Sequence, residues 1–197
     1  MQQKQRYKVL NWNKNYEHLI KLAKKVNESG FKPEVIVGIS RGGLIPSRII
    51  SDLLDNPNLA SIRVEFYEYT KKREKPKITQ PISMPIEGKK ILLVDDVADS
   101  GKSLQLVYKH LSKKAKEIRT LTIFYKPWSC LQPDYYIKET RAWIVFPWEF
   151  YETVRWIVNK TIDEEGTLEK VKNNLTEMGF DSSIIERFVR DLWNGAI

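Results

Sequence analysis

The sequence of 197 residues contains a single cysteine, Cys130, which excludes an internal disulfide framework and any metal site built from several cysteines. No stretch approaches the roughly 18 consecutive apolar residues of a membrane span, and the first residues lack the apolar segment of a secretion signal. We therefore expect a cytoplasmic protein with no membrane partner. The length suffices for a domain with a buried core, so the fold needs no disulfide or structural metal.

Acidic residues are outnumbered, since 33 Lys and Arg stand against 25 Asp and Glu and give a net charge of +8. A basic chain is compatible with nucleic-acid binding. Much of the excess, however, lies in residues 71–77 (KKREKPK). Such a run is equally typical of a solvated loop or of a segment that contacts a phosphate-rich small ligand, and composition leaves the three readings open.

Hydrophobic periodicity predicts alternating strands and helices. Helical spacing is expected over residues 14–29, 44–54, 104–111, 168–178 and 184–192. Strands are expected over residues 34–39, 61–69, 90–96, 118–125 and, as a short one, 135–137. The basic run 71–77 is expected to be a loop that continues through 78–88, and 161–166 a linker. This order predicts an α/β fold with a mostly parallel central sheet covered by helices on both faces, followed by a helical C-terminal extension over 161–197.

The most informative segment is residues 91–103, ILLVDDVADSGKS, in which an apolar strand runs into two adjacent carboxylates. Ligands of open α/β sheets bind beyond the carboxyl ends of the strands. Asp95 and Asp96 would stand there, where they suit a ribose diol or a divalent cation. The following turn, with Ser100, Gly101 and Ser103, leads into a helix whose first backbone N–H groups favour an anion. Carboxylates beside a phosphate cradle fit a phosphorylated ribose.

Other nucleotide motifs do not fit this segment. A P-loop requires glycine at the position of Asp96, and no Gly-x-Gly-x-x-Gly opens a helix after the first strand. The run ending in Asp-Asp could serve as a Walker B strand, but no Walker A accompanies it. A buried strand followed by an ordinary Ser-capped helix is disfavoured, because two adjacent acids at the end of so apolar a strand are costly without partners.

Residues 94–103, VDDVADSGKS, resemble the 5-phosphoribosyl-1-pyrophosphate binding motif of type I phosphoribosyltransferases. Residues 35–46, VIVGISRGGLIP, resemble their pyrophosphate loop, and residues 124–127 and 142–148 are similar to the xanthine–guanine type of the 6-oxopurine branch. The resemblance covers residues 7–155. It implies a purine salvage enzyme of residues 1–160 that transfers the phosphoribosyl group to guanine, hypoxanthine or xanthine and releases pyrophosphate. It also implies Mg²⁺ as cofactor and a homodimer or homotetramer.

The resemblance implies a role for each part of the site. Asp95 and Asp96 would hold the ribose hydroxyls, directly or through Mg²⁺, and Asp99 would lie near the purine imidazole nitrogen as proton acceptor. The 5′-phosphate would be held by Ala98, Asp99, Ser100, Gly101, Lys102 and Ser103. The pyrophosphate would be held by Ser40, Arg41, Gly42 and Gly43, with charge-assisted contacts from Arg41 and, as in many members, a non-proline cis peptide in this loop.

Residues 66–85 would correspond to the loop that closes over the site, with Tyr67, Tyr69 and Lys71 as candidate contacts. Residues 126–155 would form a hood over the base. In it, the donor-only ammonium of Lys126 would recognise the carbonyl at C6, Trp143 would stack on the purine, and Ile144 would offer backbone groups. Glu149 stands where the family has Asp and would accept from an exocyclic amine or bind Mg²⁺ through water.

Two alternatives stay open at this stage. Some proteins of this fold sense the ribosyl pyrophosphate and regulate RNA or DNA, and the net charge of +8 favours that slightly. Lys126 and Trp143 favour the enzyme instead, because a sensor need not keep a base pocket, so nucleic acid is not the expected partner. Adenine or orotate as the acceptor base is a more remote alternative. The extension over 161–197 is expected to bury its apolar residues on its own subunit or across a dimer.

Overall fold

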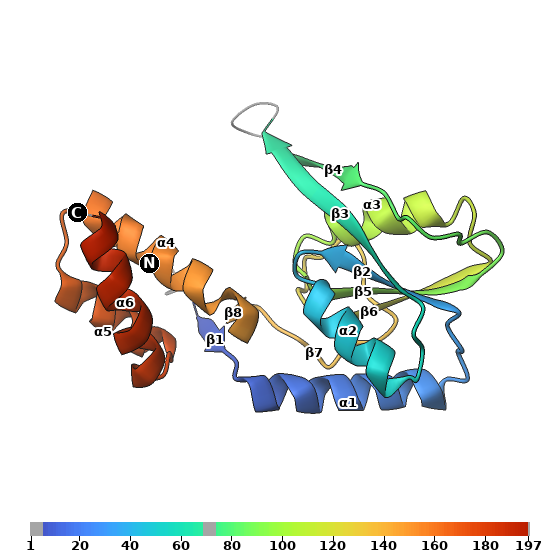
Figure 1. Ribbon diagram of the computed structural model, residues 1–197, viewed down its shortest axis with the longest axis horizontal. Helices are drawn as coiled ribbons and strands as arrows, with labels where there is room; N and C mark the ends of the chain where they lie inside the picture. The colour runs from blue at the N-terminus through green and yellow to red at the C-terminus, as the bar shows by residue number, and fades with distance from the viewer. Residues whose placement is uncertain (1–5, 69–73, 197) are drawn as a thin grey trace. The chain divides into compact units, whose positions relative to one another are not determined.

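The computed structural model describes residues 6–68 and 74–196. Its contacts divide the chain into two compact units. The sheet unit comprises Tyr16–Thr140, and the terminal unit combines Met1–Asn15 with Arg141–Ile197. Helix α1 (Trp12–Glu28) begins in the terminal unit and continues in the sheet unit (Figure 1).

The sheet unit is built on one sheet that, in the described part of the chain, has six strands in the order β4-β3-β2-β5-β6-β7. All neighbouring strands are parallel except β3 and β4, which are antiparallel. The predicted α/β class with a mostly parallel sheet is therefore confirmed. The strands are β2 (Val35–Ser40), β3 (Leu59–Glu68), β4 (Glu74–Gln80), β5 (Lys90–Ala98), β6 (Glu117–Tyr125) and β7 (Lys138–Glu139).

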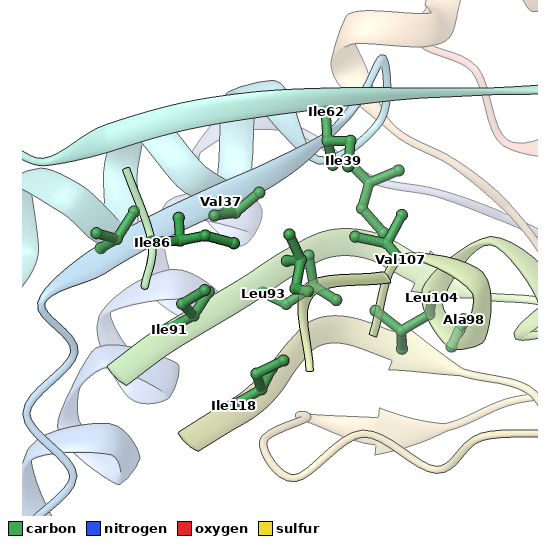
Figure 2. Close-up of a cluster of buried hydrophobic side chains, with 12 residues drawn as sticks. Val37, Ile39, Ile62, Ile86, Ile91, Leu93, Ala98, Leu104, Val107 and Ile118 are labelled. Atoms are coloured by element: carbon green, nitrogen blue, oxygen red, sulfur yellow. The ribbon is translucent and has the colours of Figure 1, made fainter. Parts of the chain in front are cut away.

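The helices of this unit lie on both sides of the sheet (Figure 1). Helix α3 (Lys102–Leu111) packs on the face that presents the odd-numbered side chains of β2 and the first part of β5. Figure 2 shows this core, which includes Val37, Ile91, Leu93 and Val107, all fully buried. Helix α2 (Leu44–Leu53) covers the opposite face, where an added Cβ on Gly38 would collide with the Ser47 hydroxyl.

The basic segment departs from the sequence prediction. Residues 74–80 were expected in a loop, but they belong to β4 and pair with β3 in the register Tyr67↔Lys75 and Glu65↔Lys77. Exposed lysines alternate here with the half-buried Pro76 and Ile78. Charged residues and proline are typical of an edge strand, because they discourage pairing with a further strand. The charges of Lys75 and Lys77 therefore lie on the edge of the sheet.

The short strand predicted over 135–137 is also corrected. Tyr135 forms only an isolated bridge to Leu121, and the strand itself, β7, follows at Lys138–Glu139. The first half of the predicted linker 161–166 is helical, because α4 (Phe150–Asp163) ends only at Asp163.

The terminal unit joins both ends of the chain through a parallel pair of short strands. Strand β1 (Tyr7–Val9) pairs with β8 (Trp143–Val145), with Lys8 opposite Ile144. The 3₁₀ turn η1 (Pro147–Glu149), α4, α5 (Leu168–Met178) and α6 (Ser182–Ala196) follow. Strand β8 and the three helices contribute to one buried core, which includes Val145, Val154, Val171, Leu175 and Val189. The extension therefore buries its apolar residues within this unit. None of the described helices is long and apolar enough to cross a membrane.

Candidate active site

The two adjacent carboxylates lie near the carboxyl end of β5, as predicted. Asp95 is half-buried and Asp96 is only 6% exposed. Each is oriented by the next backbone N–H, since Asp96 N donates to Asp95 Oδ1 (3.0 Å) and Val97 N donates to Asp96 Oδ1 (2.7 Å).

The loop of residues 40–43 lies directly against Asp96. An ideal Cβ on Gly42 would stand 2.5 Å from Asp96 Oδ2 and 2.6 Å from Oδ1, and one on Gly43 would collide with the carbonyl of Val94. Only glycine permits this approach at both positions. The peptide bond between Ser40 and Arg41 is cis, as the family resemblance led us to expect, and the Arg41 side chain is exposed. The predicted pyrophosphate loop and the carboxylates thus share one site.

The predicted phosphate cradle forms the turn between β5 and α3. Gly101 is the N-cap of α3 with φ +72°, a conformation that favours glycine. Gly101 has no side chain to cap the helix, and Lys102 N donates to Ser100 Oγ at 3.4 Å. A helix start of this kind favours an anion. Ser100 and Ser103 are half-buried in the same turn, and Lys102 is exposed.

The segment of residues 126–131, after β6, folds back onto this turn. Lys126 N donates to the carbonyl of Ala98 (3.0 Å), and Cys130 N donates to the carbonyl of Ser100 (3.0 Å). The indole Nε1 of Trp128 donates to Asp99 Oδ1 at 2.9 Å. Backbone hydrogen bonds therefore hold the predicted phosphate cradle and Lys126 together.

Lys126 is a buried cation in this segment, with 3% of its surface exposed. Burial lowers the pKa of its ammonium below the usual value of 10.5, and the negative charge of Asp99 partly offsets this. The Nζ atom also lies 5.7 Å from the centroid of the Trp128 ring. An ammonium donates hydrogen bonds and accepts none, so Lys126 is chemically suited to a ligand carbonyl.

The remaining predicted base contacts belong to the terminal unit. Trp143 is 53% exposed. Trp143 N donates to Arg6 O (2.7 Å) and Leu10 N donates to Val145 O (3.0 Å). Because ladder bonds alternate along a strand, the N–H and C=O of Ile144 point away from β1, as backbone recognition of a base requires.

The carboxylate of Glu149 lies in the turn that precedes α4. Its Oε2 accepts from the backbone N–H of Phe146 (3.4 Å), while Glu149 N donates to the backbone carbonyl of Phe146 (3.0 Å), so the residue is bonded twice to the start of the 3₁₀ turn. The structure thus gives Glu149 a local role in the 3₁₀ turn. Its predicted contact with an exocyclic amine or Mg²⁺ stays a prediction.

The candidate contacts of the closing loop fall largely outside the described residues, which exclude Tyr69 and Lys71. Tyr67 lies in β3, opposite Lys75 of β4. The segment 66–85 therefore contains the paired ends of an antiparallel hairpin, β3 and β4, and the described stretch after Gln80 is irregular.

Among residues 6–68 and 74–196, no three His, Cys, Asp or Glu side chains gather as a ready-made metal site. The carboxylates of Asp95 and Asp96 nevertheless suit Mg²⁺. This ion is usually held by one or two protein carboxylates and completes its octahedron with water and substrate phosphates. The donor set fits an ion that arrives with a phosphorylated substrate.

Sequence reasoning missed Trp128, which contacts Asp99 and lies beside Lys126. The available signal was a tryptophan directly after the Lys126-Pro127 pair, in a chain whose other features place a ligand at that end of the sheet. Its contact with Asp99 depends on the backbone folding back after β6, which no local pattern specifies.

Fold and site together define an α/β protein with a glycine-lined, acidic site at the carboxyl edge of a mostly parallel sheet, the edge at which such sheets bind ligands. Residues 6–154 match the phosphoribosyl transferase domain family, so the chain belongs to that family, as its motifs at 35–46 and 94–103 predicted.

Similar proteins agree with this assignment. A xanthine-guanine phosphoribosyltransferase of Cereibacter sphaeroides is 38% identical over 117 residues, which are 58% of this chain and 68% of that protein. The crystal structure of a purine phosphoribosyltransferase from Pyrococcus horikoshii is 44% identical with a TM-score of 0.66, covering 72% of this chain and 93% of that one. A Helicobacter pylori xanthine-guanine-hypoxanthine phosphoribosyltransferase is 27% identical with a TM-score of 0.63, covering 73% and 94% of the two chains.

Proposed function

We propose that this protein is a purine salvage enzyme that transfers the 5-phosphoribosyl group from 5-phosphoribosyl-1-pyrophosphate to a 6-oxopurine. The observation that carries the proposal is Lys126, a buried ammonium beside Asp99 at the end of β6. A donor-only group at this point pairs with a carbonyl at C6 and opposes the amino group of adenine. The names of the similar proteins, which include guanine, xanthine and purine, support the same substrate class.

The residues then act as follows. The turn of residues 98–103 holds the 5′-phosphate at the start of α3, and Asp95 and Asp96 hold the ribose hydroxyls. Mg²⁺ bound by these carboxylates and the substrate would neutralise charge on the pyrophosphate. Arg41 and the backbone of Gly42 and Gly43 hold the same group, whose charge grows as it leaves. These contacts position C1 of the ribose for attack by the base.

Bond formation joins a purine nitrogen to C1 of the ribose, and the bond from C1 to the pyrophosphate oxygen breaks. The base loses the proton of its imidazole ring, and Asp99 accepts it. Lys126 holds the C6 carbonyl, Trp143 stacks on the ring and Ile144 contributes its outward-pointing backbone groups. The products are the nucleoside 5′-monophosphate and pyrophosphate.

The test is turnover of the full chain with 5-phosphoribosyl-1-pyrophosphate, Mg²⁺ and each of guanine, hypoxanthine, xanthine and adenine, with nucleotides separated by chromatography. We expect 6-oxopurines to react and Lys126→Met to lower kcat/KM for them by about a hundredfold or more, because the C6 carbonyl and its buried surroundings lose their partner. Lys113→Met, which removes an exposed lysine, is the matched control and should leave the rates unchanged.

Other outcomes would contradict the proposal. Adenine reacting faster than every 6-oxopurine, or unchanged kinetics in Lys126→Met, would remove the assigned role of Lys126. An absence of turnover with any base, together with salt-sensitive binding of RNA or DNA, would favour the ribosyl-pyrophosphate-sensing regulator. The expected homodimer or homotetramer is tested separately by light scattering after size-exclusion chromatography.

A further inference from the structure

We propose that Trp128 is a positioning residue that orients the carboxylate of Asp99 for proton transfer through its indole N–H, an inference that rests on the proposed function. The side chain of Trp128 is 53% exposed. Its Nε1 lies 2.9 Å from Asp99 Oδ1, within the normal range of a hydrogen bond.

The position of the indole is determined by the backbone that carries it. Lys126 N and Cys130 N, on either side of Trp128, donate to the carbonyls of Ala98 and Ser100, on either side of Asp99. The segment of residues 126–131 also approaches the phosphate cradle closely, since a Cβ on Gly101 would collide with the Ser129 hydroxyl. The indole is therefore presented to Asp99 from a backbone bound to the same turn, and does not depend on a flexible arm.

The chemistry of the indole suits this role. An exposed aspartate after a strand has several rotamers, and a hydrogen bond to one oxygen selects among them. The indole N–H donates and cannot accept, so a proton transferred from the purine to the second oxygen, Oδ2, stays on Asp99. The hydrogen bond is also strongest while the carboxylate is charged. It therefore fixes the orientation of Asp99 in the state that precedes transfer of the purine proton.

The same ring connects Asp99 to the lysine that recognises the base. Lys126 Nζ lies 5.7 Å from the ring centroid, a distance at which a cation is attracted to an aromatic face. Trp128 therefore contacts both the proton acceptor and the C6-recognising group. Replacement by Phe keeps a ring beside Lys126 and removes only the donor to Asp99, so this variant isolates the proposed function of the N–H.

The kinetic test compares Trp128→Phe with Trp156→Phe, which alters a tryptophan of nearly equal exposure (54%) on α4. We expect Trp128→Phe to lower kcat for the preferred 6-oxopurine about tenfold, because Asp99 loses its fixed orientation toward the base. KM for 5-phosphoribosyl-1-pyrophosphate should stay within about twofold, and Trp156→Phe should leave both constants unchanged. In an Asp99→Asn background, Trp128→Phe should cost nothing further, because the two residues act through one contact.

A spectroscopic measurement tests the contact without relying on activity. The chain has six tryptophans, and the indole signal missing from the ¹H–¹⁵N spectrum of Trp128→Phe identifies Trp128. Asp99→Asn should move that signal more than any other indole signal.

Three results would overturn the proposal. The first is an unchanged kcat in Trp128→Phe, and the second is a loss of kcat on adding Trp128→Phe to Asp99→Asn that equals the loss in the wild type. The third is a Trp128 indole signal that does not move in Asp99→Asn. Because these comparisons require an active wild type, they leave the proposed function standing. That function fails instead if the wild-type chain forms no nucleotide with any purine.

Discussion

The contact between Gly42 and Asp96 leads to a quantitative prediction for Gly42→Ala. An added Cβ would lie 2.5–2.7 Å from the carboxylate atoms of Asp96, whereas ordinary contact begins at 3.4 Å. Either the loop or the carboxylate must therefore retreat by roughly 1 Å. Asp96 has little room for this, because it is 6% exposed and Oδ1 accepts the Val97 N–H.

The magnitude follows from where the displacement is absorbed. If the packing absorbs it, overpacking of this kind costs about 1–3 kcal/mol of the free energy of unfolding. If the carboxylate moves, a misplacement of about 1 Å in a substrate-positioning group costs about a hundredfold in rate. We expect a mixture, with kcat/KM for 5-phosphoribosyl-1-pyrophosphate reduced by about ten- to a hundredfold.

The assay combines steady-state kinetics with urea denaturation, and Gly195→Ala is its control. Gly195 lies in α6 and has no atom within 4 Å of an added Cβ, so the same substitution there meets open space. A Gly42→Ala variant with kinetics and unfolding free energy equal to those of Gly195→Ala would refute the reasoning. In that case neither Asp96 nor the loop of residues 40–43 would need its present position.

Three further predictions concern other parts of the molecule. Trp143→Ala should raise KM for the purine about tenfold through lost stacking and change stability little, because the side chain is 53% exposed; an unchanged KM would contradict its assignment. Leu175→Ala should lower the free energy of unfolding by about 2–5 kcal/mol, because Leu175 is fully buried in the helical core, while the exposed Lys172→Ala should not; urea denaturation followed by circular dichroism measures both. Lys126→Met should be more stable than the wild type at pH 7, because burial lowers the pKa of Lys126 in the folded protein and makes its charged form costly there. This difference should shrink as the pH rises from the lowered pKa toward 10.5, and a difference that grows would contradict the assignment.

The sequence predicted the central strands well and the edges poorly, for physical reasons. Strands β2, β5 and β6 are buried on both faces, so their apolar runs are long enough to recognise. Strand β4 carries lysines and a proline because it is an edge, and these residues concealed it. The pairing of β1 with β8 joins three-residue strands from opposite ends of the chain, and no local pattern encodes such a pair.

The site shows the same division between local and distant information. The motif at 94–103 predicted the carboxylates and the phosphate turn, because these residues are consecutive. The contact of Trp128 with Asp99 could not be predicted, since it depends on where the chain folds after β6. Helix α4 was not predicted, although its sequence carries a helical signal. Val154, Ile157 and Val158 follow helical spacing and are buried.

The pairing of β1 with β8 has a consequence for how this chain is made. On the ribosome, Tyr7–Val9 emerges long before its partner Trp143–Val145 has been synthesised. All strands of the central sheet emerge in the interval, so that sheet can assemble first, while β1 waits without its neighbour. The terminal unit is therefore completed last. In a nascent chain arrested before residue 143, we expect the central sheet to resist protease and the N-terminal strand β1 to be cleaved.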